Sequence, residues 1–453
     1  MNRLAIRILA ALLPFLAISA LPLVSQAAGL DDVKHIIVIY LENRSFDNLY
    51  GSFPGADGLA NVGATAAQVD KTGKPYATLP QPIDTNQKPA VPDRHFPADL
   101  PNKPFEIDPY MAIDKITGDL VHRFWHEQMQ IDGGTMGKFV AYSDAAGLAM
   151  GYYDGSKMKL WDWAKRYTLA DRFFHGAFGG SFLNHFFLVC GCVPRYEAAP
   201  ESLVAKLDAD GKLITPGPDQ ITPDGYAVNT MQPFNEPYAA SAKDPAKRLS
   251  VQDMKTIGDE LSEKGIGWAW YAGGWNDAVA GHPDKSFQFH HQVFAYFKKY
   301  APGTKERADH LKDEADLQKG IADGSLPPVV FYKPIGTLNE HPGYAEIMSG
   351  DAHIDDLLTK IEKSSIWNDA VIIVTYDEHG GFWDHVPPPK GDRWGPGLRV
   401  PTLIISPFAR KDYVDHTVYD TTSILKLIET RFGLAPLGTR DRDAGDLSNA
   451  LQF

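Results

Sequence analysis

The chain has 453 residues, of which 44% are hydrophobic and 22% charged, and its formal net charge is −13. This is the composition of a globular protein, and it excludes a disordered, collagen-like or coiled-coil chain. The acidic balance argues against a protein that binds nucleic acid by neutralising phosphates, so we expect no nucleic-acid partner.

The first 27 residues have the pattern of a secretory signal peptide. Arg3 and Arg7 give a positive start, residues 8–24 are mostly apolar, and Ser25 and Ala27 place small residues at the cleavage positions. A retained anchor is the alternative, which two prolines and the cleavage pattern disfavour. We therefore expect an exported protein, periplasmic or secreted, without a stable membrane anchor. Its domains would be the signal peptide at 1–27 and a single catalytic domain at 28–453.

Hydrophobic patterns further along the chain alternate between strands and helices. Continuous apolar runs predict buried strands at 35–40, 267–271, 328–332, 370–376 and 400–406. Helical patterns lie at about 251–264, 286–300, 353–363 and 420–432, with Asp351 as a cap of the third and Asp420 or Thr421 as a cap of the fourth. This alternation predicts a doubly wound α/β fold with a mostly parallel sheet. Residues 52–110 and 194–250 lack periodicity and are predicted to be long excursions from the core, with a possible role in covering the site.

Polar side chains follow several of the predicted strands, at the edge where an open α/β sheet binds its ligands. Glu42 and Asn43 follow the first run, and Asp377 and Glu378 follow the run at 370–376. Adjacent carboxylates repel each other unless a cation or a proton intervenes. His341 and the His290-His291 pair lie in the loops after two other strands, and oxygen and imidazole ligands suit a divalent metal. A solvated acidic turn at 377–378 is the alternative.

Ser181 follows two glycines and precedes an apolar, helix-like run. A serine at a helix N-terminus lies where backbone N–H groups and the helix dipole favour an anion. A metal ion beside it would lower its pKa and make it a nucleophile. The alternative is a simple N-cap serine. The surrounding residues are not the Gly-x-Ser-x-Gly elbow of α/β-hydrolases, which makes a Ser-His-Asp esterase less suitable.

Other histidines and the two cysteines give weaker patterns. His122 and His126 are four residues apart, as on one face of a helix, and would bind phosphate, bind metal or pack on aromatics. We expect at most one of His290 and His291 to face the site. Cys190 and Cys192 are expected to be buried thiols, because a bridge between them would close a very small ring, and a redox pair is the alternative.

Two long segments of the chain resemble signatures of a known protein family. The segment 35–51, HIIVIYLENRSFDNLYG, and the segment 376–386, YDEHGGFWDHV, resemble signatures of the bacterial phosphoesterase family that contains phosphatidylcholine-type phospholipases C and secreted acid phosphatases. Weaker matches lie at 119–122, at Ser181 with Asn184 and at 395–402, so the resemblance covers about residues 34–432.

The resemblance implies an alkaline-phosphatase-like fold, with a doubly wound, mixed but mostly parallel sheet, helices on both faces and long excursion loops. It also implies metal-assisted phosphoester hydrolysis with one divalent ion. By motif, Glu42, Asn43, Asp377 and Glu378 would hold the ion, with Ser181 beside it as nucleophile. His122, His341 and His291 or His290 would contact the phosphoryl oxygens or protonate the leaving group.

Three functions follow from these patterns. The phospholipase branch carries Pro-Asn-Arg after the nucleophile and long C-terminal domains. In this chain the stretch after Ser181 is Phe-Leu-Asn-His, and the chain ends at Phe453. We therefore expect an acid phosphatase that hydrolyses small phosphomonoesters through a phosphoserine intermediate. The second function is phospholipase C-type cleavage of phosphodiesters, for which an aromatic cage would hold a quaternary ammonium. Its candidate residues are Trp268, Trp270, Trp275, Phe287 and Phe289, with packing in the core as the alternative. The third, a non-catalytic exported binding protein, predicts loss of a site residue, and none is lost.

Overall fold

The computed structural model describes residues 29–63 and 67–453. The predicted signal peptide lies outside these residues, so it stays a prediction, as does the division into a leader and one catalytic domain. Within the described ranges, no helix combines the length and the apolar character that crossing a membrane requires.

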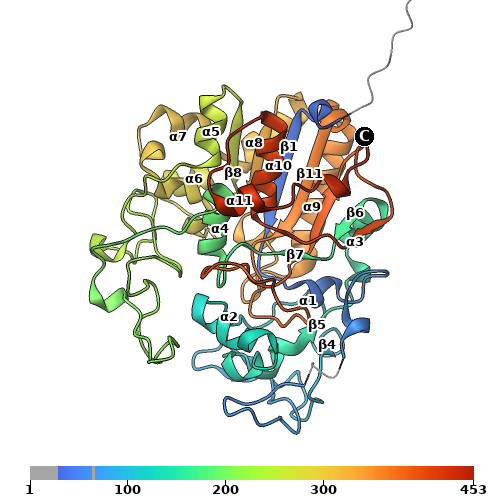
Figure 1. The fold of residues 1–453 in the computed structure, drawn as a ribbon, viewed down its shortest axis with the longest axis vertical. Coiled ribbons are helices and arrows are strands. Elements are labelled where there is room, and N and C mark those ends of the chain that lie inside the picture. Colours follow the sequence, from blue (N-terminus) through green and yellow to red (C-terminus); the bar gives the residue numbers. More distant parts are fainter. Residues whose placement is uncertain (1–28, 64–66) are drawn as a thin grey trace, which may run out of the picture.

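A sheet of eight strands forms the centre of the fold (Figure 1). Its strands, in spatial order, are β13 (Tyr413–Asp415), β6 (Thr168–Ala170), β12 (Thr402–Ile405), β11 (Ala370–Tyr376), β1 (His35–Leu41), β10 (Val329–Lys333), β8 (Trp268–Ala272) and β9 (Leu311–Asp313). Pairing is parallel throughout except that β12 runs antiparallel to both of its neighbours. The mixed, mostly parallel sheet and the α/β class are as predicted.

Helices cover both faces of this sheet. Tyr332 aligns with Ile39 in the β1–β10 register, so it lies on the face opposite to Tyr40, because successive side chains of a strand alternate. The Tyr40 hydroxyl reaches the carbonyl of Asn184 in α4, and the Tyr332 hydroxyl lies 2.7 Å from His353 in α9. Continuous apolar strands are the expected pattern for a sheet buried on both faces. The helices are α1 (Phe46–Tyr50), α2 (Phe124–Ile131), α3 (Lys159–Arg166), α4 (Ser181–Cys190), α5 (Ile257–Glu263), α6 (Trp275–Val279), α7 (Lys305–His310), α8 (Glu314–Asp323), α9 (Ile347–Lys363), α10 (Thr422–Phe432) and α11 (Thr439–Asp443).

Two helix predictions are wrong. The apolar pattern at 286–300 forms three short 3₁₀ turns, Phe289–His291, Val293–Tyr296 and Lys298–Tyr300, rather than one helix. Asp351 does not cap the helix at 353–363, because α9 begins at Ile347 and Glu346 caps it. Asp351 instead accepts the backbone N–H groups of Lys159 and Leu160, at 2.7 and 2.8 Å, and so satisfies the first turn of α3.

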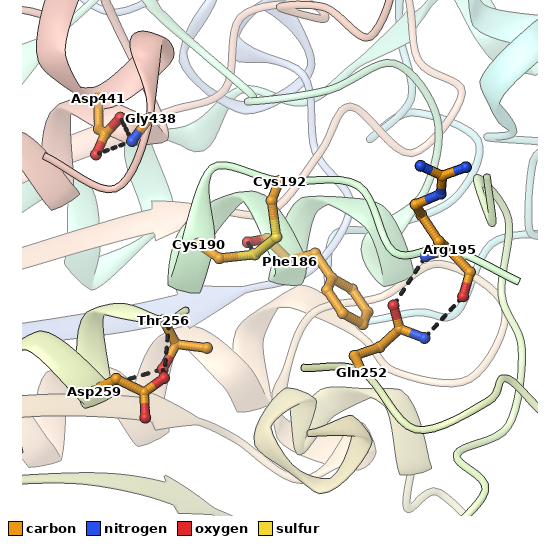
Figure 2. The surroundings of a disulfide bond; sticks show 9 residues. All are labelled: Phe186, Cys190, Cys192, Arg195, Gln252, Thr256, Asp259, Gly438 and Asp441. Atoms are coloured by element: carbon orange, nitrogen blue, oxygen red, sulfur yellow. Dashed lines mark hydrogen bonds between the residues drawn. A yellow bond between two sulfur atoms is a disulfide. The ribbon is translucent and has the colours of Figure 1, made fainter. Parts of the chain in front are cut away.

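The two cysteines form a disulfide, so the prediction of two thiols is wrong (Figure 2). Cys190 ends α4, and Gly191 takes the left-handed conformation, φ 54°, that commonly follows a helix. This reversal brings the Cα atoms of Cys190 and Cys192 to 5.1 Å, a separation that a disulfide can span.

The two predicted excursions are largely irregular. The described residues of the range 52–110 contain only the two-residue strands β2 (Ile83–Asp84), β3 (Val91–Pro92) and β4 (Phe105–Glu106) and one 3₁₀ turn. β4 pairs with β5 (Gly151–Tyr152), and β7 (Phe173–Phe174) pairs with β14 (Tyr419–Asp420) outside the main sheet. The excursion at 194–250 contributes Val228, Asn229 and Thr230 to the wall of the cleft over Ser181 that is described below.

Candidate active site

The ends of β1 and β11 bring two acidic segments together. Their register pairs Leu41 with Tyr376, so Glu42 and Asp377 leave adjacent strands at the same level. The backbone N–H of Asn43 donates to Asp377 Oδ1 at 3.2 Å. Asn43 is left-handed, φ 59°, a conformation that asparagine tolerates better than most residues. Gly380 packs on it so closely that a Cβ would lie 2.2 Å from the Asn43 carbonyl oxygen.

Ser181 is the first residue of α4 and reaches this acidic segment. Its Oγ lies 3.0 Å from Glu42 Oε2 and 3.2 Å from Asn43 Oδ1, and it donates its one proton to either oxygen. The Asn184 side chain holds the preceding turn, since Oδ1 accepts from the Ala177 N–H at 2.9 Å and Nδ2 donates to the Ala177 carbonyl at 3.0 Å. Ser181 is therefore fixed at a helix N-terminus, beside carboxylate and amide oxygens.

Three carboxylates of the site, those of Glu42, Asp377 and Glu378, are fully buried. Burial, followed by the charge of Glu42, raises the pKa of Asp377 to about 7. Burial and the charge of Asp377 raise the pKa of Glu378 well above its usual range. Within the described residues, Asp377 Oδ2 and Glu378 Oε1 have no hydrogen-bond partner. Orphaned carboxylate oxygens beside an amide oxygen and a hydroxyl are a donor set that fits a divalent cation.

Lys333 also belongs to the site, although the sequence analysis does not identify it. It is the last residue of β10 and is fully buried. Its Nζ contacts Glu42 Oε1, lies 3.5 Å from Asp377 Oδ2 and donates to the Leu41 carbonyl at 3.2 Å. The only hint in the sequence is a lysine directly after the apolar run at 328–332. Its ammonium supplies one fixed positive charge to the buried carboxylates.

The predicted histidines all lie at this edge of the sheet. His291 Nε2 is 2.9 Å from Glu42 Oε1, His122 Nε2 is 3.2 Å from Asn43 Nδ2, and His341 Nε2 is 3.9 Å from Glu42 Oε2. His290 lines the cleft. The expectation that only one of the adjacent pair faces the site is therefore wrong, because a 3₁₀ turn directs His291 to the carboxylate and His290 to the cleft wall.

Hydrogen bonds fix the orientation of two of these rings. His122 Nδ1 lies 2.5 Å from the Leu120 carbonyl, and His341 Nδ1 contacts the Pro342 carbonyl. Each Nδ1 therefore carries the proton, and each Nε2 is turned toward the site. Burial lowers the pKa of His290, His291 and His341 well below the usual value.

Two further histidines correct or complete the sequence analysis. His126 does not share a helix face with His122, because α2 begins only at Phe124. His185, which the sequence analysis leaves without a role, lies beneath the site. Its Nδ1 donates to the Ser181 carbonyl at 2.7 Å, and its ring stacks on His291 with centroids 5.2 Å apart.

A cleft of about 370 Å³ opens over Ser181. Its wall includes Glu42, Asp119, Asp144 and a single arginine, Arg123, whose Nη1 lies 2.7 Å from Asp219 Oδ1. Phe182 and Tyr344 are its aromatic residues. None of the five candidate cage aromatics lines the cleft, so the alternative that they belong to the core is the one that the structure supports. They pack in the interior instead, with Trp268 on Phe294, Trp270 on Phe331 and Phe287 on Phe289.

Comparison with known proteins places this site in a family. Residues 33–435 match the family described as "Phosphoesterase family". Phospholipase C B of Mycobacterium tuberculosis is 25% identical over 95% of this chain and 81% of its own length. The non-hemolytic phospholipase C of Burkholderia pseudomallei is 24% identical over 96% of this chain and 61% of its own. A structure from Vibrio parahaemolyticus, in the alkaline phosphatase superfamily, is a distant likeness at 13% identity and a TM-score of 0.36, covering 67% of this chain and 65% of that one.

The family match and the phospholipase C relatives indicate a phosphoric ester hydrolase. The match over nearly the whole described chain makes the family explicit: this protein belongs to the Phosphoesterase family.

Proposed function

We propose that Ser181 is the nucleophile of this hydrolase and that the preferred substrate is a phosphodiester with a cationic alcohol, cleaved in the manner of a phospholipase C. The observation that carries the nucleophile is the position of Ser181 Oγ, 3.0 Å from Glu42 Oε2 at the base of the cleft. The similarity to phospholipases C over nearly the whole chain supports a diester rather than the monoester that the sequence analysis favours.

The chain's own groups account for both halves of the reaction. Ser181 Oγ attacks phosphorus, its proton passes to Glu42 Oε2, and the bond from phosphorus to the leaving alcohol breaks. An anionic phosphoryl group in the cleft raises the pKa of His341, so its Nε2 takes up a proton from solvent and then gives it to the leaving alkoxide. Water then attacks phosphorus and gives a proton to Nε2 of His341, and the bond from phosphorus to Ser181 Oγ breaks as Glu42 returns the first proton to Oγ.

The carboxylate, amide and hydroxyl oxygens described above fit one divalent metal ion. We assign Glu42, Asn43, Asp377 and Glu378 as the residues that hold it, next to Ser181. When bound, the ion supplies positive charge that lowers the pKa of the serine hydroxyl and stabilises the phosphoryl oxygens. Dialysis against a chelator should abolish turnover, and re-addition of Mg²⁺, Ca²⁺, Mn²⁺ or Zn²⁺ in separate samples should identify the ion that restores it.

The charges of the cleft favour a cationic alcohol. Two carboxylates that are not assigned to the metal, those of Asp119 and Asp144, line the cleft, whereas its single guanidinium, that of Arg123, is paired with Asp219. A monoester dianion is repelled by this excess, whereas a diester carries one negative charge, and the ammonium of its alcohol is attracted to Asp119 or Asp144.

The test compares p-nitrophenyl phosphate with p-nitrophenyl phosphorylcholine on wild type, Ser181→Ala and Asp119→Asn. We expect a larger kcat/KM for the diester and loss of both activities, by several orders of magnitude, in Ser181→Ala. Asp119→Asn should raise the KM for the diester alone. A near-normal kcat in Ser181→Ala would overturn the assignment of Ser181 as the nucleophile. A larger kcat/KM for the monoester would overturn the choice of substrate.

Phosphomonoester hydrolysis is the second candidate, because the same groups would serve it. The observation that favours it is the stretch Phe-Leu-Asn-His directly after Ser181, which differs from the Pro-Asn-Arg of the phospholipase branch. A preference for p-nitrophenyl phosphate, retained in Asp119→Asn, would select this function.

We also propose that the protein is exported. The pattern at residues 1–27 and the Cys190–Cys192 disulfide support this, because disulfides persist mainly in oxidising compartments. N-terminal sequencing of the protein from its native host should give Ala28 as the first residue, whereas an intact Met1 in the mature protein would contradict export by cleavage.

A further inference from the structure

A second cluster of ionisable side chains lies away from the cleft. Glu127 of α2, His175 after β7 and His379 after β11 meet in the interior, and all three are fully buried. Glu127 Oε1 lies 3.0 Å from His175 Nε2, and Glu127 Oε2 lies 3.7 Å from His379 Nε2. The two rings are nearly parallel, at 8°, with centroids 5.5 Å apart. None of the three residues lines the cleft over Ser181.

Hydrogen bonds on the far side of each ring fix its orientation. His175 Nδ1 donates to the Ala177 carbonyl at 2.8 Å, and His379 Nδ1 donates to the Phe382 carbonyl at 3.2 Å. In neutral imidazoles each Nε2 then carries a lone pair directed at the Glu127 carboxylate. Neither Nε2 forms a hydrogen bond within the part of the chain that the structure describes. Lone pairs that face carboxylate oxygens repel, so the arrangement calls for a cation between them.

The other three clusters of this kind among the described residues differ from it. Arg399 lies in the cluster of Asp47, Asp384 and His385, with Nε 2.9 Å from Asp384 Oδ1. Lys333 contacts the Glu42 of the second cluster, and the third, containing His122 and His341, opens on the active-site cleft. The Glu127 cluster makes no ion pair with lysine or arginine in the described chain, so its carboxylate has no fixed cation of its own.

We propose that Glu127, His175 and His379 form a second, structural metal site for a Zn²⁺-class ion. Imidazole nitrogens and a carboxylate oxygen are zinc ligands, and bonds of about 2 Å to a tetrahedral ion place ligand atoms roughly 3.3 Å apart. His175 Nε2 lies 3.0 Å from Oε1 and His379 Nε2 lies 3.7 Å from Oε2, so each ring nitrogen is close to that distance from one carboxylate oxygen. Nδ1–H groups held by backbone carbonyls are the outer contacts that zinc-binding histidines use.

The backbone packs closely against the cluster. A Cβ on Gly397 would lie 2.0 Å from His175 Cε1 and 2.6 Å from Glu127 Oε1, so a larger residue at this position would displace both side chains. The Leu398 N–H donates to Glu127 Oε1 at 3.0 Å and orients the carboxylate. An ion here would join α2 to the turn before Ser181 and to the loop that carries Asp377.

Diffraction data collected above and below the zinc absorption edge test the site on the full chain after incubation with Zn²⁺ and removal of the excess. We expect an anomalous peak between Glu127, His175 and His379 in wild type. Ser181→Ala, which should lose turnover, should keep this peak, so the site and the proposed activity can fail independently. Absence of a peak at this place in zinc-loaded wild type would overturn the proposal and leave a proton shared between Glu127 and His175.

Metal counting by mass spectrometry on the zinc-loaded protein adds a second readout. His175→Gln and Glu127→Gln should each bind one ion fewer than wild type, and the matched control His385→Gln, in the cluster that contains Arg399, should bind the wild-type number. An unchanged count in folded His175→Gln would contradict the site. If the variants do not fold, the diffraction experiment on wild type decides.

Discussion

Replacement of Lys333 by methionine tests how the buried acidic site is held together. The substitution keeps a long apolar stem and removes the ammonium that contacts Glu42, lies 3.5 Å from Asp377 Oδ2 and donates to the Leu41 carbonyl. Because the lysine and both carboxylates are fully buried, water cannot replace the lost charge.

The expected cost follows from this burial. Removal of one partner from a buried ion pair typically costs about 3–5 kcal/mol, so the free energy of unfolding of Lys333→Met should fall by that amount at pH 8 without bound metal. The pKa of Asp377 is about 7, and loss of Lys333 raises it further. Near pH 5 the carboxyl of Asp377 is therefore protonated in the folded variant, and the cost should be smaller there.

Urea unfolding in the presence of a chelator, at pH 5 and pH 8, measures both quantities. Lys360→Met is the matched control, because Lys360 is half-exposed and, among the described residues, pairs only with Asp356 and the Gln318 amide on the surface. An exposed pair contributes about 0–1 kcal/mol. If Lys333→Met and Lys360→Met lose equal stability at pH 8, the buried ammonium does not hold the carboxylates as argued.

Substitutions at two further positions test other buried ionisable groups. Burial raises the pKa of Glu340 to about 8 from the usual 4.5. The folded protein therefore binds a proton at Glu340 more tightly than the unfolded chain does. The stability that this contributes is fully present below about pH 4.5 and is lost as the pH rises through 8. Between about pH 4.5 and pH 8, the free energy of unfolding of wild type should fall by about 1.4 kcal/mol per pH unit more than that of Glu340→Gln. Urea unfolding at several pH values measures both, and equal slopes for the two proteins would contradict this. Arg399 donates to both oxygens of Asp384, at 2.9 and 3.1 Å, and to Asp47, so Arg399→Met should cost about 3–5 kcal/mol in urea unfolding. Arg399→Lys should cost nearly as much, because an ammonium cannot reproduce the planar fork; recovery of wild-type stability by lysine would refute this geometry.

The sheet could be predicted from the sequence because its strands are unbroken apolar runs. The run at 370–376 coincides with β11, and the residues that follow β1 and β11 meet at one edge, as parallel strands require. The helix predicted at 286–300 fails for a tertiary reason. Phe294 and Phe297 pack on aromatics of β8 and α4, and this packing outweighs the local helical pattern.

The missed residues share a physical cause. Lys333 is charged, and a charged residue is expected on the surface unless the neighbouring sequence shows a partner of opposite charge. The partners of Lys333, Glu42 and Asp377, lie far from it in sequence. Glu127, His175 and His379 come from three separate segments, and only the packing of α2 against the loops after β7 and β11 brings them together. The disulfide depends on the left-handed Gly191, which spacing alone does not reveal.

The most direct test of the central claim is mass analysis of the peptide that contains Ser181 after acid quench during turnover. With p-nitrophenyl phosphorylcholine, we predict a phosphocholine adduct on Ser181, and with p-nitrophenyl phosphate a phosphoryl adduct on the same residue. Turnover at full rate with no adduct on Ser181, or with an adduct on another residue, would contradict the account.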